Sequence, residues 1–172
     1  MVCREPAGRS VGSVSSGSGA GSCGHLRPGL PLARVLGHDE GMDNTRSLAS
    51  SGSPYEGSVG FSRAVRVGQH IAVAGTAPIN ADGHVSVDPA SQARRCWEIA
   101  LGALAELGGR PDDVIRTRHY ITDGDAEVVD AISSVHGEIF GEIRPASTMV
   151  VVAGLVDPRW KVEVELEAIV AQ

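Results

Sequence analysis

Residues 161–170 read KVEVELEAIV, and this stretch decides the fold. Apolar and acidic side chains alternate along it: Val162, Val164 and Leu166 share one side, and Glu163, Glu165 and Glu167 share the other. Successive side chains of a β-strand point to opposite faces, so this pattern predicts a strand with one side on a hydrophobic core. The opposite side then carries three carboxylates in a row, each roughly 6.6–6.8 Å from the next.

The residues before this strand supply the rest of a sheet and two helices. Period-two alternation predicts strands, apolar residues at helical spacing predict helices, and Gly and Pro mark the turns between them. Seven elements are expected in chain order: strands at 61–67 and 70–74, a helix at 88–107, a strand at 113–121, a helix at 125–140, and strands at 146–152 and 161–170. The order ββαβαββ predicts an α+β fold, in which a mixed sheet with parallel pairings carries both helices on one face.

The helix at 88–107 has the clearest boundaries. Asp88–Pro89 provides an N-cap residue followed by proline at the first helical position, and Gly108–Gly109 ends the helix. Cys96 falls on the apolar stripe of this helix, which predicts a buried, unreactive thiol.

The strand at 113–121 is expected to carry partners for the glutamates. Its alternation assigns Val114, Arg116, Arg118 and Tyr120 to one face, and Ile115, Thr117, His119 and Ile121 to the other. Arg116 and Arg118 are then placed to form cross-strand ion pairs. Two interpretations of the charged face stay open. It is either the solvated outer face of a half-buried sheet, or a face that another subunit covers, where partly desolvated carboxylates serve as general acid/base groups.

Composition argues against several functional classes. The chain has 172 residues, a net charge of −6 and only 3% aromatic residues, and it contains no basic block of the kind that binds nucleic acid. No stretch approaches the ~18 apolar residues of a membrane span. No apolar signal segment follows the N-terminal arginines. A cytoplasmic protein without nucleic-acid or membrane partners is expected.

Neither a metal site nor a cofactor site is expected. Cys3, Cys23 and Cys96 lack the spacing of a metal or redox pair. His119 and His136 stand alone in the sequence, which predicts satisfied structural histidines. The glycines form neither a dinucleotide-binding nor a phosphate-binding loop.

Residues 1–41 differ from the rest of the chain. They are rich in Gly and Ser and have no apolar periodicity, so they cannot bury enough surface to offset their ordering entropy. Disorder is predicted for them. Met42 follows directly, which is consistent with translation starting naturally there. We place the extension at residues 1–49 and the folded domain at residues 50–172.

Residues 144–148, which read RPAST, are a further candidate for chemistry. The proline pre-orders the entry to a strand, and Arg144 has the planar fork that clamps a carboxylate bidentately. Ser147 has neither a glycine elbow nor a histidine partner that would make it a nucleophile. Structural roles are therefore favoured for Pro145, Ser147 and Thr148.

Several short segments together are similar to the signatures of one family. These are Ser53–Glu56, Gly60–Ala64, Val73–Thr76, Arg144–Thr148, and Leu155 with Val162–Glu165. In this order, over roughly residues 50–170, they resemble the opening and closing motifs of the reactive-intermediate deaminase (Rid, or YjgF) family. The resemblance implies a chorismate-mutase-like fold and a homotrimer whose sheets line a central barrel, with sites in clefts between subunits. It also implies hydrolysis of enamines or imines of small metabolites to a keto acid and ammonia, without a metal or organic cofactor.

The resemblance also implies roles for individual residues. Gly75 would supply a backbone carbonyl near the substrate nitrogen, and Phe61 would take a tyrosine position that shapes the cleft. One strand glutamate would position or activate the attacking water. Glu163 is preferred to Glu165, because its alignment needs the smaller gap.

The chain departs from the family pattern at one position. Deaminating members carry, two residues after the proline of the closing motif, an arginine that binds the substrate carboxylate, and this chain has Ser147 there. Loss of such a charge-assisted contact costs roughly 10- to 150-fold, so turnover of simple 2-imino acids is not expected. The chain resembles the arginine-less branches, and Arg144 would substitute only if its loop bends back. Two functions remain: an enamine or imine hydrolase, and a non-catalytic trimer that binds a small ligand or another protein.

Overall fold

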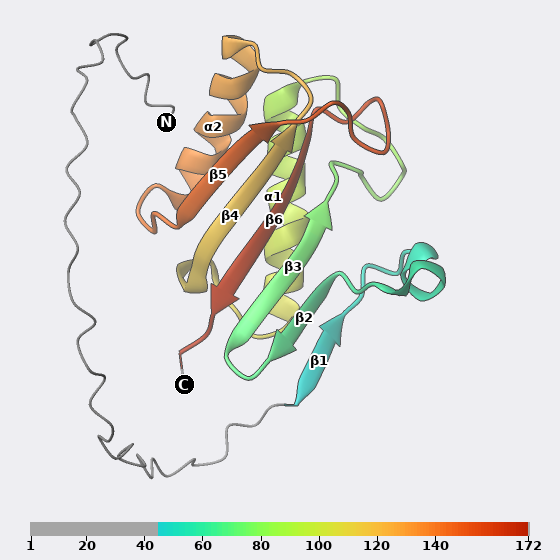
Figure 1. Ribbon diagram of the computed structural model, residues 1–172, viewed down its shortest axis with the longest axis vertical. Coiled ribbons are helices and arrows are strands. Elements are labelled where there is room, and N and C mark those ends of the chain that lie inside the picture. Colours follow the sequence, from blue (N-terminus) through green and yellow to red (C-terminus); the bar gives the residue numbers. More distant parts are fainter. Residues whose placement is uncertain (1–44, 172) are drawn as a thin grey trace, which may run out of the picture. The chain divides into compact units, whose positions relative to one another are not determined.

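A six-stranded mixed sheet carries two helices on one face in the computed structural model, which describes residues 45–171. The strands are β1 (Arg46–Ala49), β2 (Ala64–Val67), β3 (His70–Thr76), β4 (Val114–Ile121), β5 (Ala146–Val151) and β6 (Val162–Ile169). The helices are α1 (Pro89–Glu106) and α2 (Ala126–Phe140), with a short π-helical turn at Glu56–Gly60 and a 3₁₀ turn at Pro111–Asp113. Both helices lie behind the sheet in Figure 1, and the near face of the sheet carries no helix.

The strand order is β1-β2-β3-β6-β4-β5, so the strand formed by KVEVELEAIV lies inside the sheet. It pairs antiparallel with both β3 and β4, and β4 pairs parallel with β5. The predicted mixed sheet is therefore confirmed, but one of its two parallel pairings is wrong. β3 and β4 run in the same direction without being neighbours, because β6 is inserted between them.

The predicted order ββαβαββ is confirmed, and one strand precedes it. β1 pairs antiparallel with β2 and buries Ala49. The prediction had placed residues 46–49 in the N-terminal extension, because four residues are too few to establish an alternating pattern. Residues 1–44, which include Cys3, Cys23 and Met42, lie outside the described part of the chain.

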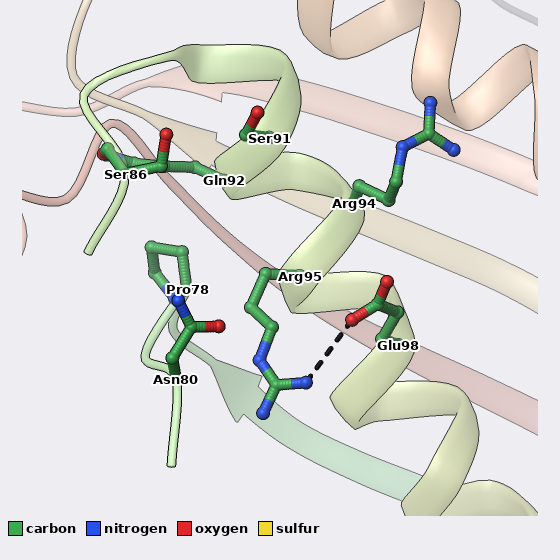
Figure 2. A pocket seen from close by; sticks show the side chains of 8 residues that line it. All are labelled: Pro78, Asn80, Ser86, Ser91, Gln92, Arg94, Arg95 and Glu98. Carbon is green, nitrogen blue, oxygen red and sulfur yellow. Dashed lines mark hydrogen bonds and ion pairs between the residues drawn. The ribbon is translucent and has the colours of Figure 1, made fainter. Parts of the chain in front are cut away.

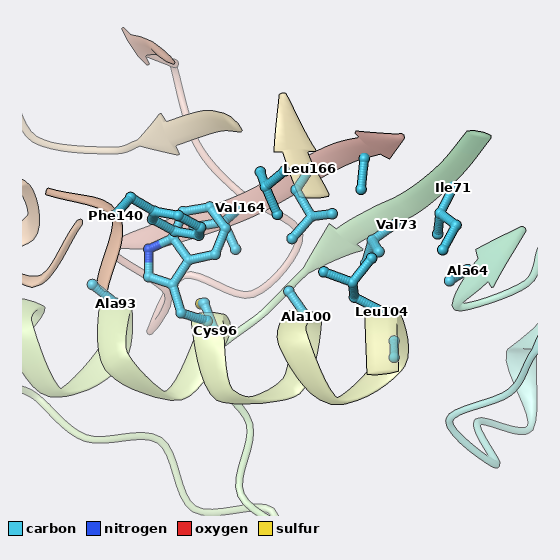
Figure 3. Packing of buried hydrophobic residues seen from close by; sticks show 14 of the residues in the cluster. Ala64, Ile71, Val73, Ala93, Cys96, Ala100, Leu104, Phe140, Val164 and Leu166 are labelled. Carbon is cyan, nitrogen blue, oxygen red and sulfur yellow. The ribbon is translucent and has the colours of Figure 1, made fainter. Parts of the chain in front are cut away.

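The core lies between the sheet and the helices (Figure 3). α1 starts where the sequence predicts: the Asp88 carboxylate accepts a hydrogen bond from the Ser91 backbone N–H at 2.8 Å. Its buried face contributes Ala93, Cys96, Trp97, Ala100, Ala103 and Leu104. Cys96 is fully buried, and burial raises the pKa of its thiol well above the ordinary value. The prediction of a buried, unreactive thiol is confirmed.

A bulge changes the faces of β4 at its first residues. The register of β4 against β6 shifts between Val114 and Arg116. Val114 is consequently buried and Ile115 is 44% exposed, the reverse of the predicted assignment. An extra residue in one strand turns the following side chains over, so the predicted faces hold only from Arg116 onward.

An aromatic cluster joins α1, α2 and β4 on the helix side of the sheet. Trp97 packs edge-on against His119 and Phe140, with ring centroids 5.3 and 5.0 Å apart. His136 Nε2 lies 3.0 Å from Thr117 Oγ1, as expected of a satisfied structural histidine.

His119 does not match that expectation completely. Its Nδ1 lies 3.4 Å from the Thr148 carbonyl, whereas its buried Nε2 has no hydrogen-bond partner among the described residues. Burial, with a smaller contribution from the neighbouring His136, lowers the pKa of His119 to about 4. The ring is therefore neutral at physiological pH and acts as a packing residue.

Candidate functional site

The three glutamates of β6 project from the face of the sheet that the helices leave uncovered. The register of β6 against β4 sets Tyr120 opposite Glu163, Arg118 opposite Glu165 and Arg116 opposite Glu167. Arg118 bonds two of the carboxylates: its Nη1 lies 2.5 Å from Glu165 Oε1 and its Nη2 lies 3.1 Å from Glu167 Oε1. The predicted cross-strand pairing is confirmed for Arg118. Arg116 forms no ion pair within residues 45–171.

Glu163 differs from the other two glutamates because no charged partner holds it. Within the described residues its carboxylate makes neither an ion pair nor a hydrogen bond, and it is half-buried. Burial raises the pKa of Glu163, the nearby positive charge of Arg63 opposes this shift, and Glu165 adds to it. A carboxylate that is desolvated and has a raised pKa is a better proton acceptor than a fully solvated one.

The Glu163 carboxylate packs directly against Gly75 at the end of β3. A Cβ atom on residue 75 would lie 2.1 Å from Glu163 Oε1, so only glycine allows the carboxylate to take this position. The register of β3 against β6 is irregular between Val73 and Thr76, which places Gly75 within a bulge. Bulges of this kind often re-aim groups beside a functional site.

Arg63 completes this group of residues, and the sequence prediction assigned it no role. Its Nη1 donates to the Gly75 carbonyl at 2.7 Å and to Thr76 Oγ1 at 3.2 Å. The signal that would have found it is a charged residue immediately before β2, between the apolar Phe61 and Ala64. We call Arg63, Gly75 and Glu163 the Gly75 cluster.

A hollow of about 280 Å³ lies beside the Gly75 cluster on the open face. Its lining residues are Ser62, Val65, Ala72, Val73, Ala74, Arg118, Glu165, Leu166 and Glu167. Ser62 and Ala74 immediately precede Arg63 and Gly75 in the chain, so the hollow borders the cluster. A small ligand in it would contact the guanidinium of Arg118, whereas Arg63, Gly75 and Glu163 are not among the lining residues.

The other predicted site residues, Phe61, Arg144 and Ser147, do not lie at the Gly75 cluster of the same protomer. Phe61 lies between the π-helical turn and β2 with its side chain 36% exposed. Arg144 has a φ of 54° in the turn after α2, and its Nε donates to the Gly141 carbonyl at 3.2 Å. Ser147 pairs in register with Thr117, so it shares the helix side of the sheet and not the side of Glu163.

A second hollow, of about 240 Å³, lies beside the first turns of α1 (Figure 2). Its two arginines already have carboxylate partners: Arg94 contacts Glu138 at 2.6 Å, and Arg95 contacts Glu98 at 3.2 Å. The buried Gln92 is also satisfied, since its amide donates to the Ser86 and Arg159 carbonyls at 2.6 and 2.9 Å. With its polar groups paired, this hollow is a weaker candidate than the Gly75 cluster.

Within residues 45–171, no group of three or more His, Cys, Asp or Glu side chains is arranged to hold a metal ion. None of the described helices combines the length and the hydropathy that a membrane crossing requires.

Comparison with known proteins places these features in context. The model of the endoribonuclease L-PSP family matches residues 53–170. Uncharacterized protein SCO2049 of Streptomyces coelicolor is 41% identical over 119 residues, which are 69% of this chain and 87% of that protein. A RutC family protein of Pyrococcus abyssi is 34% identical over 111 residues, covering 63% of this chain and 84% of that protein. The solved structure of Rv2704 from Mycobacterium tuberculosis, a member of the YjgF/YER057c/UK114 family, is 40% identical, with a TM-score of 0.66 over 73% of this chain and 100% of that one.

Proposed function

The chain belongs to the endoribonuclease L-PSP family, also called the YjgF/RutC family, and on that premise we propose that it hydrolyses enamine or imine intermediates of small metabolites at the Gly75 cluster. The observation that carries this proposal is the state of Glu163. Its carboxylate is half-buried, unpaired within the described residues and seated on Gly75, and its pKa is raised. Glu165 is a weaker choice, because Arg118 already holds it at 2.5 Å.

The chemistry needs one water molecule and one proton acceptor. Glu163 takes a proton from the water as its oxygen attacks the carbon of the C=N bond, and a carbinolamine forms. The Glu163 carboxyl group gives this proton to the nitrogen, which completes the carbinolamine. The carboxylate then takes the hydroxyl proton as the carbonyl forms and passes it to the nitrogen, which leaves as ammonia. General acid–base catalysis of this kind contributes typically 10²–10⁴-fold.

A homotrimer is part of the proposal, and so is a cytoplasmic location. The open face of the sheet carries the half-buried carboxylate of Glu163 on β6, and Val150 of the edge strand β5 is 42% exposed. Neighbouring subunits that cover this face would exclude water from the hollow. They would also bring Phe61, Arg144 or Ser147 of one subunit toward Glu163 of another, which a single protomer does not do. Light scattering at micromolar concentration tests this assembly, and a monomer would contradict it.

The nuclease name of the family model is not carried over to this chain. Binding of RNA depends mainly on cationic contacts to phosphate groups. The chain has a net charge of −6, and the open face of its sheet presents three glutamates.

The alternative function is a trimer that binds a small ligand or another protein without catalysis. One observation favours it: Ser147 stands at the position of the family arginine, on the side of the sheet away from Glu163. A screen of metabolites by thermal shift addresses it directly. A metabolite that stabilises the protein and is recovered unchanged would support this alternative.

The hydrolase is tested by following ammonia and keto product from imines generated in solution. Glu163→Gln should lower the rate roughly 10²–10⁴-fold, because it removes the proton acceptor. Gly75→Ala should also lower the rate, because its methyl group displaces the carboxylate without changing its charge.

Glu127→Gln is the control, since it removes an exposed carboxylate of α2 on the helix side of the sheet and should stay within a few fold of the native rate. The absence of any acceleration over buffer for both acidic and neutral imines would contradict the proposal, and so would full activity of Glu163→Gln.

A further inference from the structure

Arg63 carries a positive charge that no carboxylate in the described part of the chain neutralises at close range. None of the ion pairs within residues 45–171 includes it, although Arg94, Arg95, Arg118 and Arg159 each contact an acidic side chain. Its guanidinium instead donates to two neutral acceptors, the Gly75 carbonyl and Thr76 Oγ1. Its Nε–H is buried and has no acceptor among residues 45–171.

An unpaired, buried N–H on a charged group is costly in a folded protein. Arg66, three residues further along the chain on β2, shows the usual solution: its Nε donates to the Gly68 carbonyl at 2.9 Å and its Nη1 to the Leu107 carbonyl at 2.7 Å. Arg63 therefore differs from Arg66 by one free donor. That donor belongs to the cluster in which Glu163 lies.

The neighbouring carboxylates do not pair with the Arg63 guanidinium. Glu56 is held by Ser50 and Ser51 at 2.5–2.7 Å, and mainly these hydrogen bonds lower its pKa to about 2. Glu163 lies against Gly75 and forms no ion pair with the Arg63 guanidinium. Glu165 and Glu167 are bonded to Arg118. None of the carboxylates within residues 45–171 thus neutralises Arg63 at close range.

We propose that Arg63 is the anion-binding residue of this site and that it takes a carboxylate of the ligand, in place of the arginine that Ser147 replaces on β5. This inference rests on the proposed function for the identity of the site, and it names the class of ligand. A planar guanidinium is suited to a carboxylate, because its parallel N–H groups match the two oxygens. Turnover of 2-imino acids, which Ser147 alone makes doubtful, is then expected.

The test is a binding experiment that needs no turnover. The full chain is titrated with 2-oxobutanoate, an unreactive keto acid, and with 2-butanone, which has the same carbon skeleton without the charge. Native protein should bind the keto acid, and Arg63→Gln should bind it at least tenfold more weakly. Arg66→Gln is the matched control and should leave the dissociation constant within twofold. Equal affinity of Arg63→Gln and native protein would overturn the inference, as would equal binding of the two compounds by native protein.

A second measurement uses the native protein and so does not depend on a variant folding. The Nε–H resonance of Arg63 should shift in an NMR titration with 2-oxobutanoate and stay in place with 2-butanone. No shift at saturation would overturn the inference. Failure of the hydrolase alone would appear differently, as keto-acid binding at Arg63 without release of ammonia from any imine.

Discussion

The two sides of strand β6 have opposite characters. On the helix side, Val162, Val164, Leu166 and Ala168 are no more than 2% exposed and pack into a single apolar core. On the other side, Glu163, Glu165 and Glu167 are partly exposed, two of them are ion-paired with Arg118, and one is unpaired within the described residues. Burial of a large apolar side chain stabilises a fold by about 1.5–3 kcal/mol, whereas partly exposed ion pairs contribute little. The helix side of β6 thus contributes mainly to stability, and the open side carries the candidate catalytic groups. Substitutions on the helix side should mainly lower the free energy of unfolding, and substitutions on the open side should mainly change activity.

The largest expected effect is on the helix side. Trp97→Ala removes a fully buried ring from between α1, α2 and β4, and should lower the free energy of unfolding by about 3–5 kcal/mol. Urea denaturation measures it. The matched change on the open side, Val150→Thr, should cost no more than about 0.5 kcal/mol in an isolated protomer. A clearly larger cost of Val150→Thr would show that the open face is buried between subunits, as the proposed homotrimer requires.

A smaller effect on the same side concerns pH. The folded pKa of His119 is about 4, below the ordinary 6.5, so the unfolded chain takes up a proton first as pH falls. The stability is therefore full above pH 6.5 and is lost progressively between 6.5 and about 4, by about 3 kcal/mol in total. Denaturation curves across this range measure the loss.

His119→Leu provides the control for this pH dependence. The variant should lose less stability than the native protein between pH 6.5 and 4, because carboxylates and His136 still titrate in both proteins while His119 titrates in only one. Identical pH dependence in the two proteins would contradict the assignment of this loss to His119.

The smallest expected effect is on the open side. The negative charge of Glu165 helps to raise the pKa of Glu163, after burial. Glu165→Gln should therefore lower the pKa of Glu163, and the acid limb of the pH–rate profile should move to lower pH, since the proton acceptor must be ionised. The carboxyl ¹³C shift of Glu163 reports the same titration without turnover. A shift of this pKa to higher values would contradict the inferred electrostatics.

Sequence patterns predicted the secondary structure well where one residue type repeats at a fixed period. The alternation of KVEVELEAIV and the caps of α1 at Asp88 and Gly108–Gly109 are local signals, and both elements lie within two residues of their predicted bounds. Local signals failed at β1, whose four residues gain their order only by pairing with β2. They failed again at the start of β4, where a bulge turns Val114 inward.

The candidate site was predicted in its parts but not in its assembly. Family resemblance selected Gly75 and Glu163, and the structure brings these two residues into contact. The family resemblance did not select Arg63, because in sequence a single arginine before a strand cannot be told from a solvated surface charge. Its contact with the site is visible only in the structure, where its Nη1 donates to the Gly75 carbonyl at 2.7 Å. The family resemblance also placed Ser147 in the same site as the glutamates, although the register of β4 and β5 sets Ser147 on the helix side of the sheet.

The amino-acid sequence by itself determined both helices and every strand except β1, which side of β6 is apolar, and that the chain carries an acidic sheet face. These properties follow from side-chain period and capping, which act over a few neighbouring residues. Only the tertiary structure decided that β6 lies between β3 and β4, and that Arg63, Gly75 and Glu163 meet. Those contacts join segments far apart in the chain, and their geometry depends on strand order, register and bulges that no local pattern encodes.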